Sequence, residues 1–255
     1  KTLNIKRFCL KGKKMKIDSQ ILIGKCALVS GATGGIGSTI SLALAEQGCN
    51  LFLTSSTDYS LQDVAELCKK YNIKVEVCSG NLSHKDDIYK IIRHAKKHFK
   101  KVDILINSAG IFPNTSLSET DDDLFSEVLN VNFRSAFLFT REFSRDMVDQ
   151  KWGRIVNIGS SSAYSGFSGT SMYCASKHAL LGFSRAIHDE LKQYNVRSYC
   201  ISPSSTQSKM GVATKGQDYT TFLDPADIAR YLVFTISFDS NIMSEEIFLK
   251  RMLVR

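Results

Sequence analysis

Short apolar runs recur along the chain, separated by longer stretches in which apolar residues are spaced three or four apart. Short runs of this kind are typical of buried strands, and the wider spacing is typical of helices that bury one face. Strands are predicted at 26–30, 51–54, 74–78, 102–106, 155–158, 196–201 and 246–249. Helices are predicted from the glycine-rich stretch to Gly48, over 61–71 with Ser60 as N-cap, from Ser83 to Phe99, over 122–150, through Tyr173 to about Tyr194, and from Asp224 and Pro225 to about 236.

This alternation of strand and helix predicts an α/β fold, a doubly wound parallel sheet with helices on both faces. No linker or internal repeat divides residues 20–255, so we expect one domain there, preceded by a separate segment at 1–19. Residues 204–223 carry no clear pattern.

Composition and charge fit one large domain. The chain has 255 residues, of which 43% are hydrophobic, and its formal charge is +8. Seven basic residues and no acid lie within 1–16, and without them the chain has 26 basic and 25 acidic residues. A targeting arm is one interpretation of this segment, but a flexible leader or an extension ahead of a start at Met15 is favoured. We therefore expect no nucleic-acid partner, and no apolar run is long enough for a membrane span.

The seven cysteines are scattered and form no C-x-x-C pair, which is typical of free thiols in a reducing compartment and favours a cytoplasmic location. His94 and His98 have the spacing of two metal ligands on a helix. They lie among Lys and Arg residues with no third ligand nearby in sequence, so a solvated basic face is the favoured interpretation and no metal site is predicted.

The stretch from Gly31 to Gly37 reads G-A-T-G-G-I-G and lies between a predicted strand and a predicted helix. Glycines allow a tight turn and a close approach of backbone to ligand, and the helix N-terminus attracts anions. This context predicts a phosphate-binding loop.

A second candidate site follows the strand at 155–158. Tyr173 and Lys177 lie one helical turn apart, and Ser160, Ser161 and Ser162 precede them. An ammonium group near a phenol lowers the pKa of the phenol, which would make Tyr173 a general acid or base near neutral pH.

Four stretches follow the C-termini of predicted strands: the glycine loop, Asn107–Gly110, Ser160 and Pro203. In parallel sheets these ends meet at one edge, so we expect them to line one crevice.

With these features in one order, roughly residues 20–250 resemble the short-chain dehydrogenase/reductase family. Ser30–Gly37 matches T-G-x-x-x-G-[IL]-G with Ser for Thr, and Asn107–Gly110 matches N-N-A-G with one departure. Tyr173 and Lys177 fill Y-x-x-x-K, and Ser160 lies thirteen residues before Tyr173, which favours it over its two serine neighbours. Asn132 stands where the family has its catalytic asparagine.

The resemblance implies a Rossmann-type fold and reversible hydride transfer between a nicotinamide cofactor and a carbonyl or secondary alcohol. Tyr173 would exchange the proton, Lys177 would lower its pKa and bind the cofactor ribose, Ser160 would bind the substrate oxygen, and Asn132 would hold a water. The implied cofactor-binding residues are Gly31, Thr33, Gly35, Ile36, Gly37, Ser55, Ser56, Asn81, Leu82, Asn107, Ala109, Gly110, Tyr173, Lys177 and Pro203.

NADP is favoured over NAD because Ser55, and not a carboxylate, occupies the position after the second strand that binds the adenosine ribose in NAD enzymes. Gly34 stands where a basic residue is frequent in NADP enzymes, so NAD stays possible.

The resemblance is closest to small carbonyl reductases and to 3-oxoacyl-carrier-protein reductases, and it implies a homotetramer or homodimer. The latter enzymes usually have basic residues at the positions of Lys151 and Tyr194 to bind their acidic carrier protein. Only one is basic here, the segment 204–223 is short for the family's substrate lid, and Pro203-Ser204 replaces the usual Pro-Gly.

A general carbonyl reductase acting on a small carbonyl, alcohol or acyl thioester is therefore the first hypothesis, and the carrier-protein reductase is the alternative. A non-catalytic nucleotide-binding regulator is a third hypothesis, which the complete set of four catalytic residues disfavours.

Overall fold

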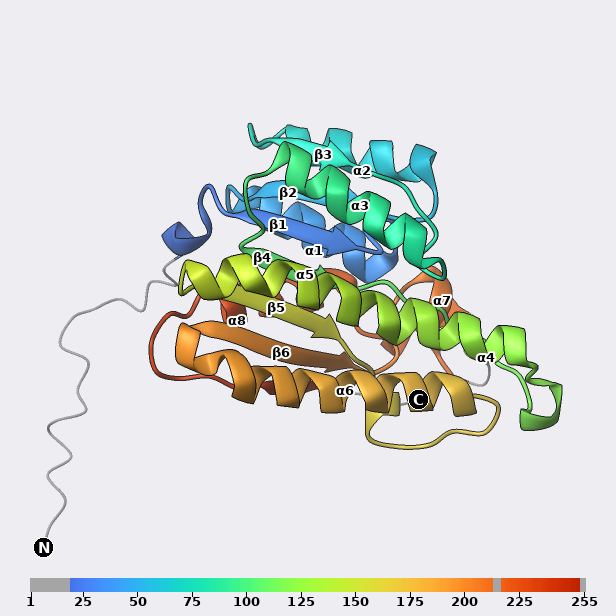
Figure 1. The fold of residues 1–255 in the computed structure, drawn as a ribbon. Helices are drawn as coiled ribbons and strands as arrows, with labels where there is room; N and C mark the ends of the chain where they lie inside the picture. Colours follow the sequence, from blue (N-terminus) through green and yellow to red (C-terminus); the bar gives the residue numbers. More distant parts are fainter. Residues whose placement is uncertain (1–18, 213–216, 253–255) are drawn as a thin grey trace, which may run out of the picture.

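Seven parallel strands form one sheet in the order β3-β2-β1-β4-β5-β6-β7 (Figure 1). The structure is a computed structural model that describes residues 19–212 and 217–252, so the basic segment up to residue 18 and residues 213–216 of the expected lid lie outside the described residues. The strands are β1 (Cys26–Ser30), β2 (Asn50–Thr54), β3 (Val75–Val77), β4 (Ile104–Asn107), β5 (Gly153–Ile158), β6 (Val196–Pro203) and β7 (Glu246–Leu249). Every predicted strand is confirmed, with ends within two residues of those expected.

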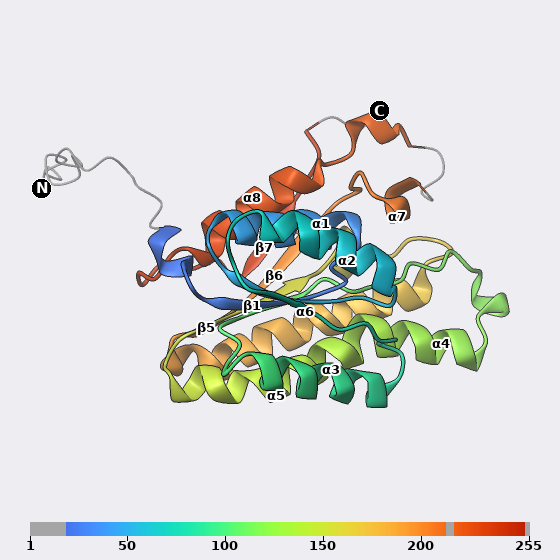
Figure 2. The same cartoon turned by 90° about the horizontal axis from the view of Figure 1, so that it is seen from above.

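Helices cover both faces of this sheet. They are α1 (Gly35–Glu46), α2 (Asp58–Lys69), α3 (Lys85–His98), α4 (Asp122–Leu129), α5 (Ser135–Asp149), α6 (Ser171–Leu191), α7 (Lys209–Val212) and α8 (Pro225–Ile236). Figure 2 shows α1, α2 and α8 on one face and α3, α5 and α6 on the other. Ile40, Leu44 and Leu232 belong to the apolar layer of the first face, and Ile91 and Phe139 belong to that of the second. The predicted doubly wound fold is confirmed.

The starts of two helices differ from the sequence prediction. Ser60 does not cap α2, because the helix begins earlier at Asp58, whose carboxylate in the first turn favours the helix dipole. Helix α3 likewise begins at Lys85 and not at Ser83. The predicted start of α8 is confirmed, since the Asp224 side chain accepts a hydrogen bond of 2.8 Å from the Ala226 N–H.

The stretch 122–150 is not one continuous helix. A π turn at Asn130–Arg134 separates α4 from α5. Such turns hold one extra residue and are frequent at functional sites. The Ser135 hydroxyl donates to the Val131 carbonyl over 2.7 Å, which supports the backbone where the α-helix resumes.

The chain changes direction across the sheet between β1 and β4, which are neighbours although β2 and β3 lie between them in sequence. Connections from these two strands lead to opposite sides, so a crevice forms beyond their carboxyl ends. Among the described residues, no helix is long and apolar enough to cross a membrane.

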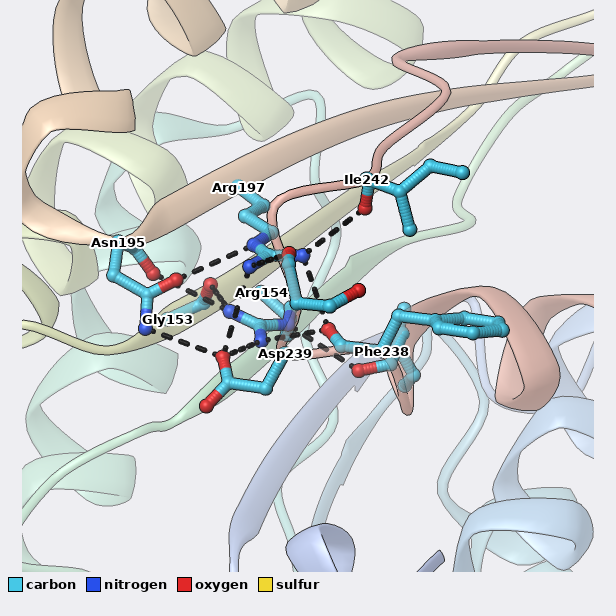
Figure 3. Close-up of polar contacts among 9 residues, drawn as sticks. Gly153, Arg154, Asn195, Arg197, Phe238, Asp239 and Ile242 are labelled. Atoms are coloured by element: carbon cyan, nitrogen blue, oxygen red, sulfur yellow. Dashed lines mark hydrogen bonds and ion pairs between the residues drawn. The ribbon is translucent and has the colours of Figure 1, made fainter. Parts of the chain in front are cut away.

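The opposite end of the sheet holds a buried arginine, Arg154, at the start of β5 (Figure 3). Its guanidinium donates to the carbonyls of Ile236 and Phe238 over 3.2 and 3.1 Å and to the Asp239 carboxylate over 2.7 Å. It also lies 4.4 Å from the centre of the Trp152 ring. These contacts fix β5 to the end of α8 and the segment after it.

Candidate active site

The glycine loop between β1 and α1 can be built only with glycine at two positions. Gly31 has a φ of +68°, and a Cβ there would lie 2.7 Å from the Ala109 Cα. A Cβ on Gly37 would lie 2.1 Å from the Gly31 carbonyl oxygen. The turn is therefore tight, and it lies directly against the loop that follows β4.

The N-terminus of α1 fits an anionic ligand such as a pyrophosphate. No side chain caps this helix at Gly34, so its first N–H groups are available, and the positive end of the helix dipole faces the same side. A Cβ on Gly35 would lie 2.9 Å from the Ser208 Cβ. The segment after β6, whose structure the sequence did not reveal, thus packs over the loop.

Two hydroxyl groups meet beside this loop, where β2 ends. The Thr33 and Ser55 hydroxyls are hydrogen-bonded at 2.6 Å, and Ser55 is buried whereas Ser56 is exposed. Both serines therefore lie where the sequence predicted the adenosine end of a dinucleotide to bind.

Asn81 and Leu82 follow β3. The Asn81 side chain accepts a hydrogen bond from the Ser83 N–H over 2.9 Å, and its own N–H donates to Asp87 over 2.7 Å. Leu82 is buried. The turn is thus held by local bonds, with the Asn81 amide group at its exposed side.

Asn107, at the end of β4, turns its side chain into the sheet. Its buried side chain donates to the Asn157 side chain over 2.9 Å, which links β4 to β5 within the sheet. Its side-chain nitrogen is therefore occupied within the sheet, while its side-chain oxygen has no hydrogen-bond partner among the described residues. Ala109 and Gly110 follow in the loop that lies against Gly31.

Helix α6 carries Tyr173 and Lys177, both buried. The Lys177 ammonium group donates to the Ile158 carbonyl over 2.8 Å and lies 5.7 Å from the centre of the Tyr173 ring. Ser160 follows β5, and its hydroxyl accepts from the Ser162 N–H over 3.1 Å and lies near enough to the Tyr173 phenol to lower the pKa of that phenol. Ser160 is the serine of the three that the thirteen-residue spacing favoured.

Asn132 lies in the π turn and is also buried. Its side-chain amide donates to the Ile111 carbonyl and the Ser176 hydroxyl, each over 3.0 Å, and its oxygen accepts from the Ile111 N–H over 2.8 Å. A Cβ on Gly110 would lie 3.4 Å from this oxygen and 3.7 Å from the Lys177 nitrogen. Gly110 therefore lies between the Asn132 amide and the Lys177 ammonium group, and because it has no side chain, only its backbone occupies this space.

Burial dominates the pKa values of both Tyr173 and Lys177. Burial lowers the pKa of Lys177 to about 8. Burial raises the pKa of Tyr173, and the Ser160 hydroxyl opposes this only in part. The expectation that Lys177 lowers the pKa of Tyr173 stays a prediction, since desolvation of the phenol dominates its pKa here and the ammonium group donates to the Ile158 carbonyl.

Two contacts of the site were missed by the sequence reasoning. Phe112 packs edge-on against Tyr173, with ring centres 4.7 Å apart, and Ser176 joins Asn132 to the Tyr173 carbonyl. Phe112 lies two residues after Gly110, and Ser176 lies inside the Tyr173–Lys177 motif. Only their positions next to the two motifs could have indicated a role in the site, because Phe and Ser are common residue types in loops and helices.

Known proteins resemble this chain in sequence and in structure. Residues 25–218 match the family described as short chain dehydrogenase. The 3-oxoacyl-[acyl-carrier-protein] reductase FabG of Rickettsia conorii is 33% identical over 189 residues, which are 74% of this chain and 76% of that protein. The uncharacterized oxidoreductase YgcW of Escherichia coli is 33% identical over 204 residues, 80% of this chain and 78% of that one.

A similar solved structure is that of a metagenomic short-chain oxidoreductase in complex with NADP. It has a TM-score of 0.80 and 25% sequence identity, and the match covers 91% of this chain and 99% of that one. The extent of these matches and the order of the motifs show that the chain belongs to the short-chain dehydrogenase family of oxidoreductases.

Proposed function

We propose that this protein transfers a hydride between NADP(H) and a carbonyl or secondary alcohol, with Tyr173 as general acid and base. The observation that carries the proposal is the meeting of Ser160, Tyr173 and Lys177 beside Asn132 at the carboxyl ends of β4 and β5. The cofactor, when bound, supplies or accepts the hydride, and the protein's residues position the substrate and move the proton.

Each residue has a role that its contacts support. The Ser160 hydroxyl, beside the Tyr173 phenol, orients the substrate oxygen towards it. Tyr173 donates its proton to that oxygen in the reductive direction and takes it back in the oxidative one. Lys177 holds positive charge below pH 8 and binds a ribose hydroxyl, while Asn132 fixes the loop at Ile111 and holds a water beside Lys177.

We propose NADP over NAD because the Thr33 and Ser55 hydroxyls occupy the end of β2, where an NAD enzyme would use a carboxylate. The NADP complex of the metagenomic oxidoreductase supports this preference. It is tested by comparing kcat/KM for NADPH and NADH with one substrate, and a higher value for NADH would contradict it.

The general acid is tested by replacing Tyr173 with Phe. General acid catalysis contributes about 10²–10⁴-fold, so Tyr173→Phe should lower kcat at least about a hundredfold and leave the dissociation constant for NADPH within a few-fold. The assay follows loss of the reduced nicotinamide absorbance with a panel of ketones and diketones. Tyr194→Phe, just beyond the far end of α6, is the matched control and should keep full activity. Turnover of Tyr173→Phe within a few-fold of wild type would refute the assignment.

A second candidate function is reduction of a 3-oxoacyl thioester on a carrier protein, which the identity to the FabG protein of Rickettsia conorii favours. The two positions that the resemblance connects with carrier-protein binding support it only by half, since Lys151 is basic and Tyr194 is not. Both precede a strand, β5 and β6, whereas Ser160 follows β5, so a carrier protein bound there would have to reach along a strand about 20 Å long. Equal kcat/KM for a 3-oxoacyl thioester on carrier protein and on a short thiol would contradict carrier recognition.

We further propose that the protein forms a homodimer or homotetramer, as the family resemblance implies. Exposed aromatic side chains on α8 and β7, among them Tyr231, Phe234 and Phe248, support an interface on that side. Light scattering during size exclusion would measure the mass, and a monomer at micromolar concentration would contradict the proposal.

A further inference from the structure

A histidine pair on α3 is completed by an acidic residue from the neighbouring strand. His94 and His98 lie one turn apart with their rings stacked at 4.4 Å, and Glu76 comes from β3. The Glu76 carboxylate lies 3.0 Å from Nδ1 of His98. One ligand atom from each of the three residues lies within 4.8 Å of the other two.

We propose that Glu76, His94 and His98 bind a divalent transition-metal ion, with Zn²⁺ as the best match. Two imidazoles and one carboxylate, with water as a fourth ligand, form a ligand set that Zn²⁺ accepts. Ligand atoms around tetrahedral Zn²⁺ are about 3.3 Å apart, given bonds of about 2.0–2.2 Å. Bringing the three atoms to that spacing takes movements of about 1 Å, which rotation of partly exposed side chains supplies.

The backbone under the proposed site is held in place from both sides. Strand β3 pairs with β2, and the opposite face of α3 is buried through Ile88, Ile91 and Ala95. The His94 ring packs against Phe52 with centres 5.8 Å apart. The three ligands therefore come from fixed elements, which reduces the entropy lost when an ion orders them.

The site is open to solvent on one side. The His98 and Glu76 side chains are 26% and 29% exposed, which leaves a path for the ion.

One neighbouring cation opposes the metal. The Lys74 nitrogen lies 3.8 Å from the Glu76 carboxylate and donates to the His98 carbonyl over 2.6 Å. Its charge competes with Zn²⁺ for the same carboxylate. Removing the Lys74 charge should therefore tighten zinc binding. A purely structural role of Glu76, His94 and His98 would not produce this effect.

A bound ion would join the edge strand β3 to α3. This strand has three residues and lies at the end of the sheet, so it has a single strand neighbour among the described residues. The connection from β3 to α3 contains Asn81 and Leu82. The ion would thus stabilise a part of the chain where the resemblance implies cofactor-binding residues.

Calorimetric titration of ZnCl₂ into the full-length, tag-free, chelator-treated protein tests the proposal. We expect one equivalent to bind and the Tm to rise by about 5 °C at saturation. Glu76→Gln and His98→Asn should each weaken binding at least about tenfold, and Lys74→Gln should tighten it a few-fold. Circular dichroism without zinc checks that each variant is folded.

His188→Asn is the matched control. His188 on α6 also faces a glutamate, Glu245, at 3.9 Å, but these two residues are not part of the three-ligand group. Its zinc affinity should equal that of wild type. Absence of binding at 100 times the protein concentration, or binding that Glu76→Gln and His98→Asn leave unchanged, would overturn the proposal, and so would equal weakening by His188→Asn.

Discussion

Lys177 lowers the stability of this protein at neutral pH, and replacing it with Met should reveal by how much. The ammonium group is buried on α6 with one hydrogen bond to the Ile158 carbonyl, and its pKa falls from 10.5 to about 8. A pKa difference of one corresponds to about 1.4 kcal/mol, so holding the charge in the folded protein costs about 3 kcal/mol. Loss of the hydrogen bond in Lys177→Met offsets about 1 kcal/mol of this. We expect the variant to be more stable than wild type by about 2 kcal/mol at pH 7.

The pH dependence of the free energy of unfolding is a second test of the effect of Lys177 on stability. Because the pKa of Lys177 is lower in the folded protein than in the unfolded chain, the unfolded chain binds more protons between pH 8 and 10.5. The stability that Lys177 takes away below pH 8 is therefore regained as pH rises through this window. The advantage of Lys177→Met should shrink, and then reverse, as pH approaches 10.

Urea denaturation of both proteins at pH 7, 8, 9 and 10 measures this difference, in which the titrations of other groups largely cancel. Lys85→Met, at an exposed position on α3, is the control and should show no such trend. A difference between wild type and Lys177→Met that stays constant from pH 7 to pH 10 would refute the reasoning. The variant should also lose turnover, so stability and activity would change in opposite directions.

Three further substitutions test the fold and the cofactor site. Arg154→Met should lower the free energy of unfolding by about 2–4 kcal/mol, because it leaves buried carbonyls without donors, and urea denaturation would measure it. Gly37→Ala should cost about 1–3 kcal/mol and weaken NADPH binding, because its Cβ would overlap the Gly31 carbonyl, and a melting curve with and without NADPH would show both effects. Ser55→Asp should shift the ratio of kcat/KM for NADPH over NADH towards NADH by roughly ten- to thirtyfold through repulsion of a 2′-phosphate, and an unchanged ratio would place that phosphate elsewhere.

The order of strands and helices was predictable because each depends on a local pattern. The run Cys26–Ser30 is buried throughout, and the Asp224-Pro225 pair does begin a helix. The placement of the proposed catalytic pair was predictable for a related reason, since Tyr173 and Lys177 are four apart and the helix alone brings them to the same face.

Features that depend on distant partners were not predictable. Glu76 lies eighteen residues before His94 in sequence, and only the β3–α3 packing brings them together. The raised pKa of Tyr173 follows from how completely the fold buries the phenol, which spacing along the chain does not reveal. The side chain of Asn107 turns into the sheet because Asn157 lies opposite it on β5.

The π turn also escaped the sequence pattern, because one extra residue barely disturbs an apolar period of 3.6 in a stretch as apolar as 128–133. It places α4 and α5 out of phase by one residue, roughly 100° of rotation around the helix axis. Deleting one residue from 130–134 would restore an uninterrupted helix, but it would either turn Asn132 away from Ile111 or rotate Phe139 and Phe143 out of the core. An insertion or deletion in this stretch would therefore disrupt either the core or the position of Asn132. As long as the protein needs both, the length of the α4–α5 segment is as constrained as its amino-acid composition.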